Sequence, residues 1–286
     1  MFVIIGYIVI CGTIFGGYAL AGGHLGGLWQ PLEVLMIFGG ALGSFVVGND
    51  AKALKATAKE LPSIFKGSKF NKALYMDLLA LLFEILAKIR KDGMMSIEGD
   101  VENPEASPLF SKYPKLLHDH HLTEFITDYL RLMGSGNMDA FQIENLMDSE
   151  IETHHMEGHV PAHCIAKLGD ALPAFGIVAA VMGVVHTMES LHLPPNELGV
   201  LIGHALVGTF LGILLAYGFV GPLSGLLEQK LEESTKMYHT VKVTLISSLN
   251  GYAPAIAVEF GRKILYSTER PGFLELEAHI KQAKGK

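Results

Sequence analysis

Residues 171–188 read ALPAFGIVAAVMGVVHTM, an apolar run without Asp, Glu, Lys or Arg that is close to the length needed to cross a lipid bilayer. Three further runs have the same character, at 1–21, 32–47 and 198–223, of which the second is somewhat short. Half of the 286 residues are hydrophobic and only 18% are charged, so the chain is too apolar for an ordinary soluble domain of this size. The sequence therefore predicts an all-α, polytopic membrane protein with four transmembrane helices.

The distribution of positive charge predicts the orientation of these helices. All 22 Lys and Arg residues fall within 52–167 or 230–286, whereas the short connections 22–30 and 190–197 contain none. Because positively charged segments next to a span stay in the cytoplasm, both connections should face outward and both termini should lie inside. The competing reading, a cleaved signal peptide, requires a basic region at the start of the chain, where the residues are Met, Phe and Val.

The spans also predict how the chain divides. We expect transmembrane helices 1 and 2 within 1–50, a cytoplasmic helical domain within 51–170, transmembrane helices 3 and 4 within 171–225, and a cytoplasmic helical extension with a mobile basic tail within 226–286. The fourth span should continue directly into this extension, because apolar residues recur along one side of the chain after residue 222.

The central range carries the periodicity of helices rather than of strands. Apolar side chains recur at intervals of three and four from Leu74 to Ile89, and again from Phe125 to Met133. Three prolines between residues 104 and 114 divide the region into shorter helices and turns. A compact helical domain is the structure that this pattern indicates.

Small residues recur at helical spacing in the last two apolar runs. The pairs are Gly176/Ala180, Ala179/Gly183 and Gly208/Gly212. Such spacing lets two helix backbones approach closely in lipid. The pairs could pack the chain's own helices against each other, or they could line a seam with another subunit, and the sequence leaves both readings open.

The apolar runs carry no acidic side chain near the middle of the membrane. Glu33 and Glu189 lie at the edges of their runs, from which they can reach the membrane surface. A protein that moves protons or cations usually needs a buried carboxylate. The last two runs offer only these polar groups: His186, Thr187, His204, Thr209 and Tyr217. If the chain conducts ions, we expect a second polypeptide to supply the carboxylate.

Two prolines and one basic cluster have both a structural and a functional interpretation. Pro173 follows Asp170 at the spacing of an ordinary helix start, and Pro222 predicts a bend where the fourth span leaves the membrane. Either could instead be a flexible point that couples the membrane helices to the rest of the chain. Arg90 and its basic neighbours end an amphipathic helix, where they favour the helix dipole or present a charged face to a partner.

Several other classes of protein are disfavoured. A net charge of −7 leaves no basic face for nucleic acid. Cys11 and Cys164 form no CxxC pair, and the histidines between residues 154 and 163 lack the glutamate of HExxH or a Cys/His array, so we expect neither a metal site nor a cofactor. No phosphate-binding loop or nucleophile motif is present, and an enzyme is not expected.

Four stretches are specific beyond their hydropathy. They are YMDLLALL at 75–82, residues 173–185, residues 207–219, and NGYAP at 250–254 followed by VEFGRK at 258–263. Together with four spans and a large loop between the second and the third, they make the sequence similar to the MotA-type stator subunits of the bacterial flagellar motor. These subunits belong to the MotA/TolQ/ExbB proton channel superfamily. The resemblance covers nearly the whole chain, and a variant that serves a lateral flagellum is compatible with it.

The resemblance implies a function, a location and partners. In the family, five copies in the inner membrane surround two copies of MotB, whose single membrane helix carries an essential aspartate, and ion flow drives rotation. Arg90 and Glu98 match residues that engage the rotor protein FliG. Pro173 and Pro222 match two prolines that couple protonation to conformational change, and Thr209 matches a threonine that faces the ion path.

The resemblance also bears on the ion. In sodium-driven relatives a threonine stands at the position of Ala180, and alanine offers no side-chain oxygen to Na⁺, so proton drive is favoured. Three rival hypotheses remain. They are an ExbB/TolQ-type energiser of another envelope process, a self-sufficient ion transporter, and a membrane scaffold without ion flow.

Overall fold

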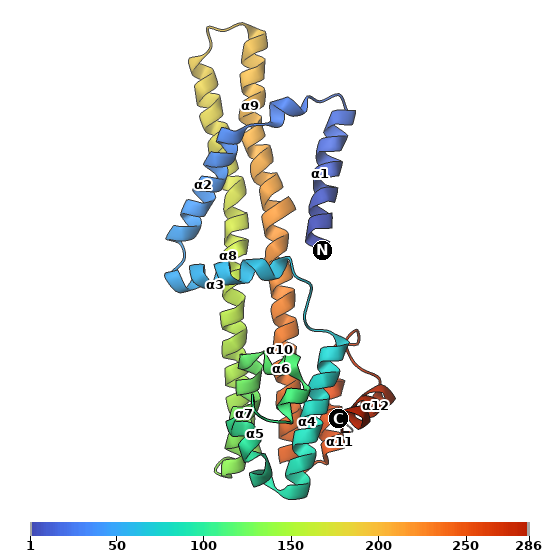
Figure 1. Cartoon of the computed structure of the whole chain (residues 1–286). Helices are drawn as coiled ribbons and strands as arrows, with labels where there is room; N and C mark the ends of the chain where they lie inside the picture. The colour runs from blue at the N-terminus through green and yellow to red at the C-terminus, as the bar shows by residue number, and fades with distance from the viewer. Residues whose placement is uncertain (1, 285–286) are drawn as a thin grey trace. The chain divides into compact units, whose positions relative to one another are not determined.

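The computed structural model describes residues 2–284, and within this range the chain is helical without a β-strand (Figure 1). The predicted all-α class is confirmed. The helices form two compact units. The membrane unit comprises Met1–Gly67 and Glu157–Lys230, and the second unit comprises Ser68–Met156 and Leu231–Lys286.

Four helical segments are long and apolar enough to cross a membrane, as predicted. The first is α1 (Phe2–Leu20). The second consists of the short η1 (Leu25–Leu28) followed by α2 (Pro31–Val47). The others lie in α8 (Ala140–Glu189) and in the continuous run of α9 (Pro195–Ile213), η4 (Leu214–Val220) and α10 (Gly221–Leu249). The amphipathic α3 (Ala51–Ile64) follows α2 and is capped by Asp50, whose carboxylate accepts the Ala53 N–H at 2.8 Å.

Pro173 does not begin a helix. It lies inside α8, which runs for 50 residues through both Pro161 and Pro173, so the predicted helix start at Pro173 is wrong. A proline removes one hydrogen bond from a helix, whereas ending the helix in lipid would leave several backbone groups without partners. Continuing the helix is therefore the smaller cost.

Pro222 is accommodated by a local change in helix type. The seven residues of η4 directly before Gly221 are π-helical, and the Gly221 N–H bonds to the carbonyl of Ala216, five residues back. Proline has no N–H to donate and its ring crowds the preceding turn, which the wider π-helix relieves. The predicted continuation of the fourth span is confirmed, because α10 extends to Leu249.

The membrane unit has a small core and exposed outer faces. One cluster of buried residues comes from α2, α8 and η4, namely Ile37, Ala41, Leu168, Leu172, Ala179 and Ala216, and a second comes from α3, α8 and α10, namely Ile64, Ala162, Ile165 and Leu227. Helix α1 buries none of its side chains, and it is attached through Tyr7, whose hydroxyl donates to the Phe219 carbonyl at 2.9 Å. The apolar side chains that remain exposed on α1 and α8 suit a lipid or protein environment.

The second unit is built around α4 (Lys72–Asp92). Its remaining elements are η2 (Met94–Ile97), α5 (Glu98–Glu102), η3 (Phe110–Lys112), α6 (Pro114–Leu117), α7 (His120–Ser135), parts of α8 and α10, α11 (Pro254–Lys263) and α12 (Phe273–Lys284). Both predicted apolar stripes face its core, with only their last residues, Ile89 and Met133, partly exposed. Residues 281–284, at the start of the expected basic tail, belong to α12, and residues 285–286 lie outside the described chain.

Candidate functional site

Helices α8 and α9 cross with their backbones in contact. A β-carbon on Gly176 would lie 2.8 Å from the Gly208 carbonyl oxygen and 3.0 Å from the Gly212 Cα. A β-carbon on Gly212 would lie 2.8 Å from the Leu172 carbonyl oxygen. Real side chains do not approach backbone this closely, so only glycine fits at these two positions. The crossing is therefore fixed by main-chain contact.

The same contact continues along both helices. A β-carbon on Gly208 would lie 3.2 Å from the Ala180 nitrogen, and one on Gly183 would lie 2.8 Å from the Ala205 Cβ. These glycines pack the chain's own two helices, which is the first of the two readings that the sequence left open. Hereafter the α8–α9 crossing means the contact of Gly176 to Gly183 with Ala205 to Gly212.

The two predicted ion-pathway residues, Ala180 and Thr209, both belong to this crossing. Both are half-buried, and Gly208, the residue before Thr209, lies against the main chain of Ala180. The Thr187 hydroxyl donates to the Gly183 carbonyl at 2.9 Å, one turn back. Within residues 2–284 the Thr209 hydroxyl makes no such bond, so it is available to another group.

The side chain of Glu33 is buried inside the membrane unit. Its side chain is 8% exposed, and its Oε2 lies 3.2 Å from the position that a β-carbon on Gly208 would take. Glu33 is therefore buried among the helices instead of extending outward from the edge of its apolar run. The spacing of Glu33, Ile37 and Ala41 at intervals of four places all three on the buried face of α2, and this pattern was the available signal.

The two prolines lie at different distances from the crossing. Pro173 follows Leu172, whose carbonyl oxygen abuts Gly212, so it lies at one end of the α8–α9 crossing. Pro222 is exposed and comes after the π-helical η4. The structure thus places Pro173 at one end of the crossing that contains Ala180 and Thr209, and Pro222 outside it.

The predicted rotor-contact residues lie on a tight turn of the second unit. Arg90 is in the last turn of α4, and Glu98 is the first residue of α5, and both are exposed. Between them the chain reverses at Gly93, whose φ of 83° is a conformation that favours glycine. We call residues 88–100 the charged turn.

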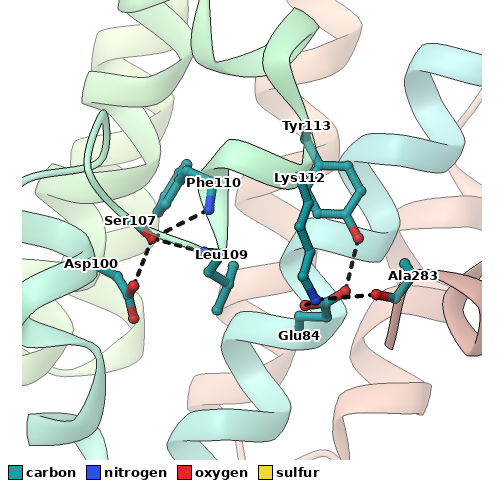
Figure 2. Close-up of polar contacts among 8 residues, drawn as sticks. All are labelled: Glu84, Asp100, Ser107, Leu109, Phe110, Lys112, Tyr113 and Ala283. Carbon is teal, nitrogen blue, oxygen red and sulfur yellow. Dashed lines mark hydrogen bonds and ion pairs between the residues drawn. The ribbon is translucent and has the colours of Figure 1, made fainter. Parts of the chain in front are cut away.

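A buried polar network that the sequence analysis missed holds the charged turn. The buried Asp100 carboxylate accepts from the Lys88 ammonium at 2.7 Å and from the Ser107 hydroxyl at 2.6 Å. The Ser107 oxygen in turn accepts the N–H groups of Leu109 and Phe110, as Figure 2 shows. No motif in the sequence points to this set, because its members meet only through the fold of the turn.

A second network links α4 to distant parts of the chain. The Glu84 carboxylate accepts from Lys112 at 2.9 Å and from the Tyr113 hydroxyl at 3.0 Å (Figure 2). Lys112 also donates to the Ala283 carbonyl in α12 at 3.1 Å. Burial, together with the negative charge of Glu84, raises the pKa of Tyr113 above its ordinary value, so the phenol remains a donor.

The histidine cluster pairs with acids rather than forming a ligand set. His155 lies 3.2 Å from Glu232 and His159 lies 3.8 Å from Glu228. Among the described residues there is no group of three or more metal-ligating side chains.

Two family models match the chain, motility protein A N-terminal at residues 4–93 and the MotA/TolQ/ExbB proton channel family at residues 117–256. The chain is 58% identical over 284 residues to "Motility protein A" of Salmonella typhimurium strain LT2, covering 99% of this chain and 96% of that protein. The chain belongs to the motility protein A family. Its relatives and its two family models thus make it a motility protein of the proton channel type.

Other members of the motility protein A family agree with this assignment. The identity is 59% to "Motility protein A" of Escherichia coli strain K12, over 99% of this chain and 96% of that protein. The identity is 36% to "Chemotaxis protein LafT" of Vibrio parahaemolyticus, over 98% of this chain and 99% of that protein. The fold matches the Campylobacter jejuni MotAB structure with a TM-score of 0.76 at 22% identity, covering 93% of this chain and 95% of that chain. It matches the MotAB stator complex of Bacillus subtilis with a TM-score of 0.73 at 23% identity, covering 90% and 92%.

Proposed function

We propose that this chain is a flagellar motor stator subunit. It works with a MotB-type subunit, whose membrane aspartate carries the transported proton, and it converts proton flow across the inner membrane into torque on the rotor protein FliG. The observation that carries the proposal is the α8–α9 crossing, which places Gly208, the residue before Thr209, against the main chain of Ala180 and leaves the Thr209 hydroxyl available. The two solved relatives are MotAB complexes, which supports a partner of the MotB type.

The crossing suits a partner helix on its outer side. Its glycines leave the two backbones in contact, while large apolar side chains of α8 point outward and remain exposed, namely Ile177, Val178, Val181, Met182 and Val185. In a membrane such faces are covered by lipid, by a partner helix or by another copy of the chain. The proposed assembly is a ring of five copies around the partner, which covers these faces.

Proton uptake supplies a change of shape in this scheme. Protonating the partner's aspartate removes its charge and changes its fit against Ala180 and Thr209. One charge that crosses a potential of about 100 mV releases roughly 2.3 kcal/mol, so each step must be small. Pro173 and the π-helix before Pro222 interrupt the regular hydrogen bonding of α8 and of the fourth span, and helices bend at such points.

The charged turn transmits the movement to the rotor. Arg90 and Glu98 are exposed on a turn that Asp100 holds in place, and they carry opposite charges. Complementary charges of this kind set the specificity of an interface and the rate of encounter more than its affinity. Both chain termini are placed in the cytoplasm in this scheme, on the rotor side.

Co-expression with the MotB-type subunit tests the proposal. We expect the two chains to co-purify, and the mass of the complex gives the copy numbers. In liposomes the complex should conduct protons and this chain alone should not. Conduction by the single chain would make it a self-sufficient transporter.

A motility assay tests the ion and the coupling residues. Swimming should persist without sodium and stop with a protonophore, because Ala180 offers no oxygen ligand to Na⁺. Arg90→Glu and Pro173→Ala should lower motility without lowering the amount of the complex in the membrane. Unchanged motility in both variants would indicate a scaffold.

A further inference from the structure

Glu33 is a buried acid whose carboxylate has one oxygen without a partner. Its side chain is 8% exposed, and within residues 2–284 no donor reaches Oε2. The carboxylate lies in the first turn of α2, but it does not cap this helix. The N-cap residue Gln30 forms no side-chain capping bond, and Oε2 of Glu33 accepts no backbone N–H. The helix terminus therefore does not explain why an acid is placed here.

The surroundings of Glu33 supply no compensating charge. Residues 1–51 and 168–229 contain no Lys or Arg. On the outer halves of the two helices packed around it, the titratable side chains are His186 and Glu189 on α8 and Glu197 and His204 on α9. None of these forms an ion pair with Glu33 in the described part of the chain. An unpaired charge buried in this way costs several kcal/mol, so the charge must be neutralised by a proton or by a group from outside the chain.

The position of the carboxylate connects it to the α8–α9 crossing. A β-carbon on Gly208 would lie 3.2 Å from Glu33 Oε2, from the Ala179 Cβ and from the Ala180 nitrogen alike. The orphaned oxygen therefore lies against the crossing at Gly208, the residue before Thr209. Acids that persist inside membrane proteins are costly and mark ion pathways.

We propose that Glu33 is a second proton-binding site of the ion path, situated in this chain and distinct from the acid of the partner. The inference rests on the proposed stator function. In the uptake step, a hydronium ion from the outer aqueous phase transfers its proton to the Glu33 carboxylate, and a carboxylic acid and a water molecule result. In the release step, the O–H bond of Glu33 breaks and the proton passes, through water or the Thr209 hydroxyl, to the carboxylate of the partner. Glu33 returns to its charged form and one proton has moved inward.

Three variants of the full chain, each expressed with the MotB-type partner, test this proposal. Glu33→Gln keeps the size of the side chain but cannot bind a proton, and Glu33→Asp keeps the acid. Glu189→Gln is the matched control, because Glu189 is an acid at the end of α8 whose side chain is 74% exposed. Proton conduction by the complex in liposomes and swimming speed are measured as the external pH is varied.

We expect Glu33→Gln to assemble with the partner and to lower conduction by on the order of tenfold or more, because a positioned proton-transfer group contributes at least that much. Glu189→Gln should conduct like the unmodified complex. The infrared spectrum of the complex should lose a carboxylic acid band in Glu33→Gln and keep it in Glu189→Gln. Unchanged conduction in an assembled Glu33→Gln complex overturns the proposal.

Two further outcomes distinguish a failure of the Glu33 proposal from a failure of the proposed stator function. If the unmodified complex does not conduct, the proposed stator function fails and not the role of Glu33. If Glu33→Gln does not accumulate in the membrane, Glu33→Asp carries the test. A proton-binding site predicts that Glu33→Asp retains a pH-dependent speed with a displaced midpoint, and an unchanged midpoint contradicts the proposal.

Discussion

The ammonium group of Lys88 lies 2.7 Å from the carboxylate of Asp100, and this ion pair closes the turn that carries Arg90 and Glu98. Lys88 stands two residues before Arg90, and Asp100 stands two residues after Glu98. The ion pair therefore fixes the separation of Arg90 and Glu98. Its acidic member, Asp100, is itself buried. The buried acid thus anchors the turn to the fold of the second unit.

Replacing Asp100 with Asn should lower motility while Arg90 and Glu98 remain in place. The amide can still accept from Ser107, but the ion pair is lost, and we expect a loss of about 1 kcal/mol of stability because Lys88 is partly exposed to solvent. Swimming speed and the thermal unfolding midpoint are measured. Lys88→Met should add little to Asp100→Asn in a double-mutant cycle, and exposed Lys115→Met is the control. Additive effects would show that the pair does not act as a unit.

Replacing Gly212 with Ala should separate the two helices of the crossing. The new methyl group would meet the Leu172 carbonyl oxygen at 2.8 Å and the Gly176 Cα at 2.9 Å, and backbone cannot move aside as a flexible side chain can. We expect a loss of about 1–3 kcal/mol of stability. Gly203→Ala, in the same helix but with no atom within 4 Å of its β-carbon, should be tolerated. Equal thermal midpoints in detergent for the two variants would contradict a main-chain contact.

Replacing Thr209 with Val tests whether its hydroxyl serves the ion path. Valine has the shape of threonine without the oxygen, so packing is kept. Conduction should fall by about fivefold if one hydrogen bond worth about 1 kcal/mol is lost in the limiting step. Thr187→Val is the control, because the Thr187 hydroxyl is already bonded to the Gly183 carbonyl. Similar conduction in both variants would leave Thr209 with a packing role only.

Glu259 should make the second unit sensitive to acid. Two hydrogen bonds from the Arg262 guanidinium, at 2.7 and 2.6 Å, lower the pKa of Glu259 below its ordinary value of 4.5, although burial opposes this shift. A lowered pKa in the folded state contributes stability above pH 4.5 that is lost as the pH falls through the folded-state value. The thermal midpoint should therefore drop on acidification below 4.5, and it should drop less in Glu259→Gln. An equal drop in both would assign the acid sensitivity elsewhere, and Glu277→Gln is the control.

Much of the fold could be predicted from the sequence because hydrophobic periodicity reports directly on burial. The spans follow from the length of the apolar runs, and the stripes from Leu74 and from Phe125 follow from the spacing of apolar residues. Pro173 was placed wrongly because local rules treat proline as a helix start, whereas lipid penalises a broken helix more than one missing bond. The need to pair backbone N–H and C=O groups in lipid outweighs the local preference of proline for a helix start.

The candidate site could be predicted only in part. Ala180 and Thr209 come from the resemblance to known stators, and the glycine spacing indicated a close crossing but not which helices formed it. The burial of Glu33 was not predicted, because an acid at the edge of an apolar run was expected to extend to the membrane surface. The fold packs this part of α2 against α9. The Lys88–Asp100 pair depends on a chain reversal at Gly93, and no periodic pattern encodes such a contact.

The π-helical segment before Pro222 contains one residue more than an ordinary α-helical turn would in the fourth span. If that segment rewound as an ordinary α-helix, the chain after Gly221 would be displaced by one residue, which amounts to a turn of about 100° and a shift of about 1.5 Å along the axis. Such a change resembles a screw motion, in which a small advance is coupled to a large rotation. A motor subunit built on this segment could thus turn a long helix without breaking it.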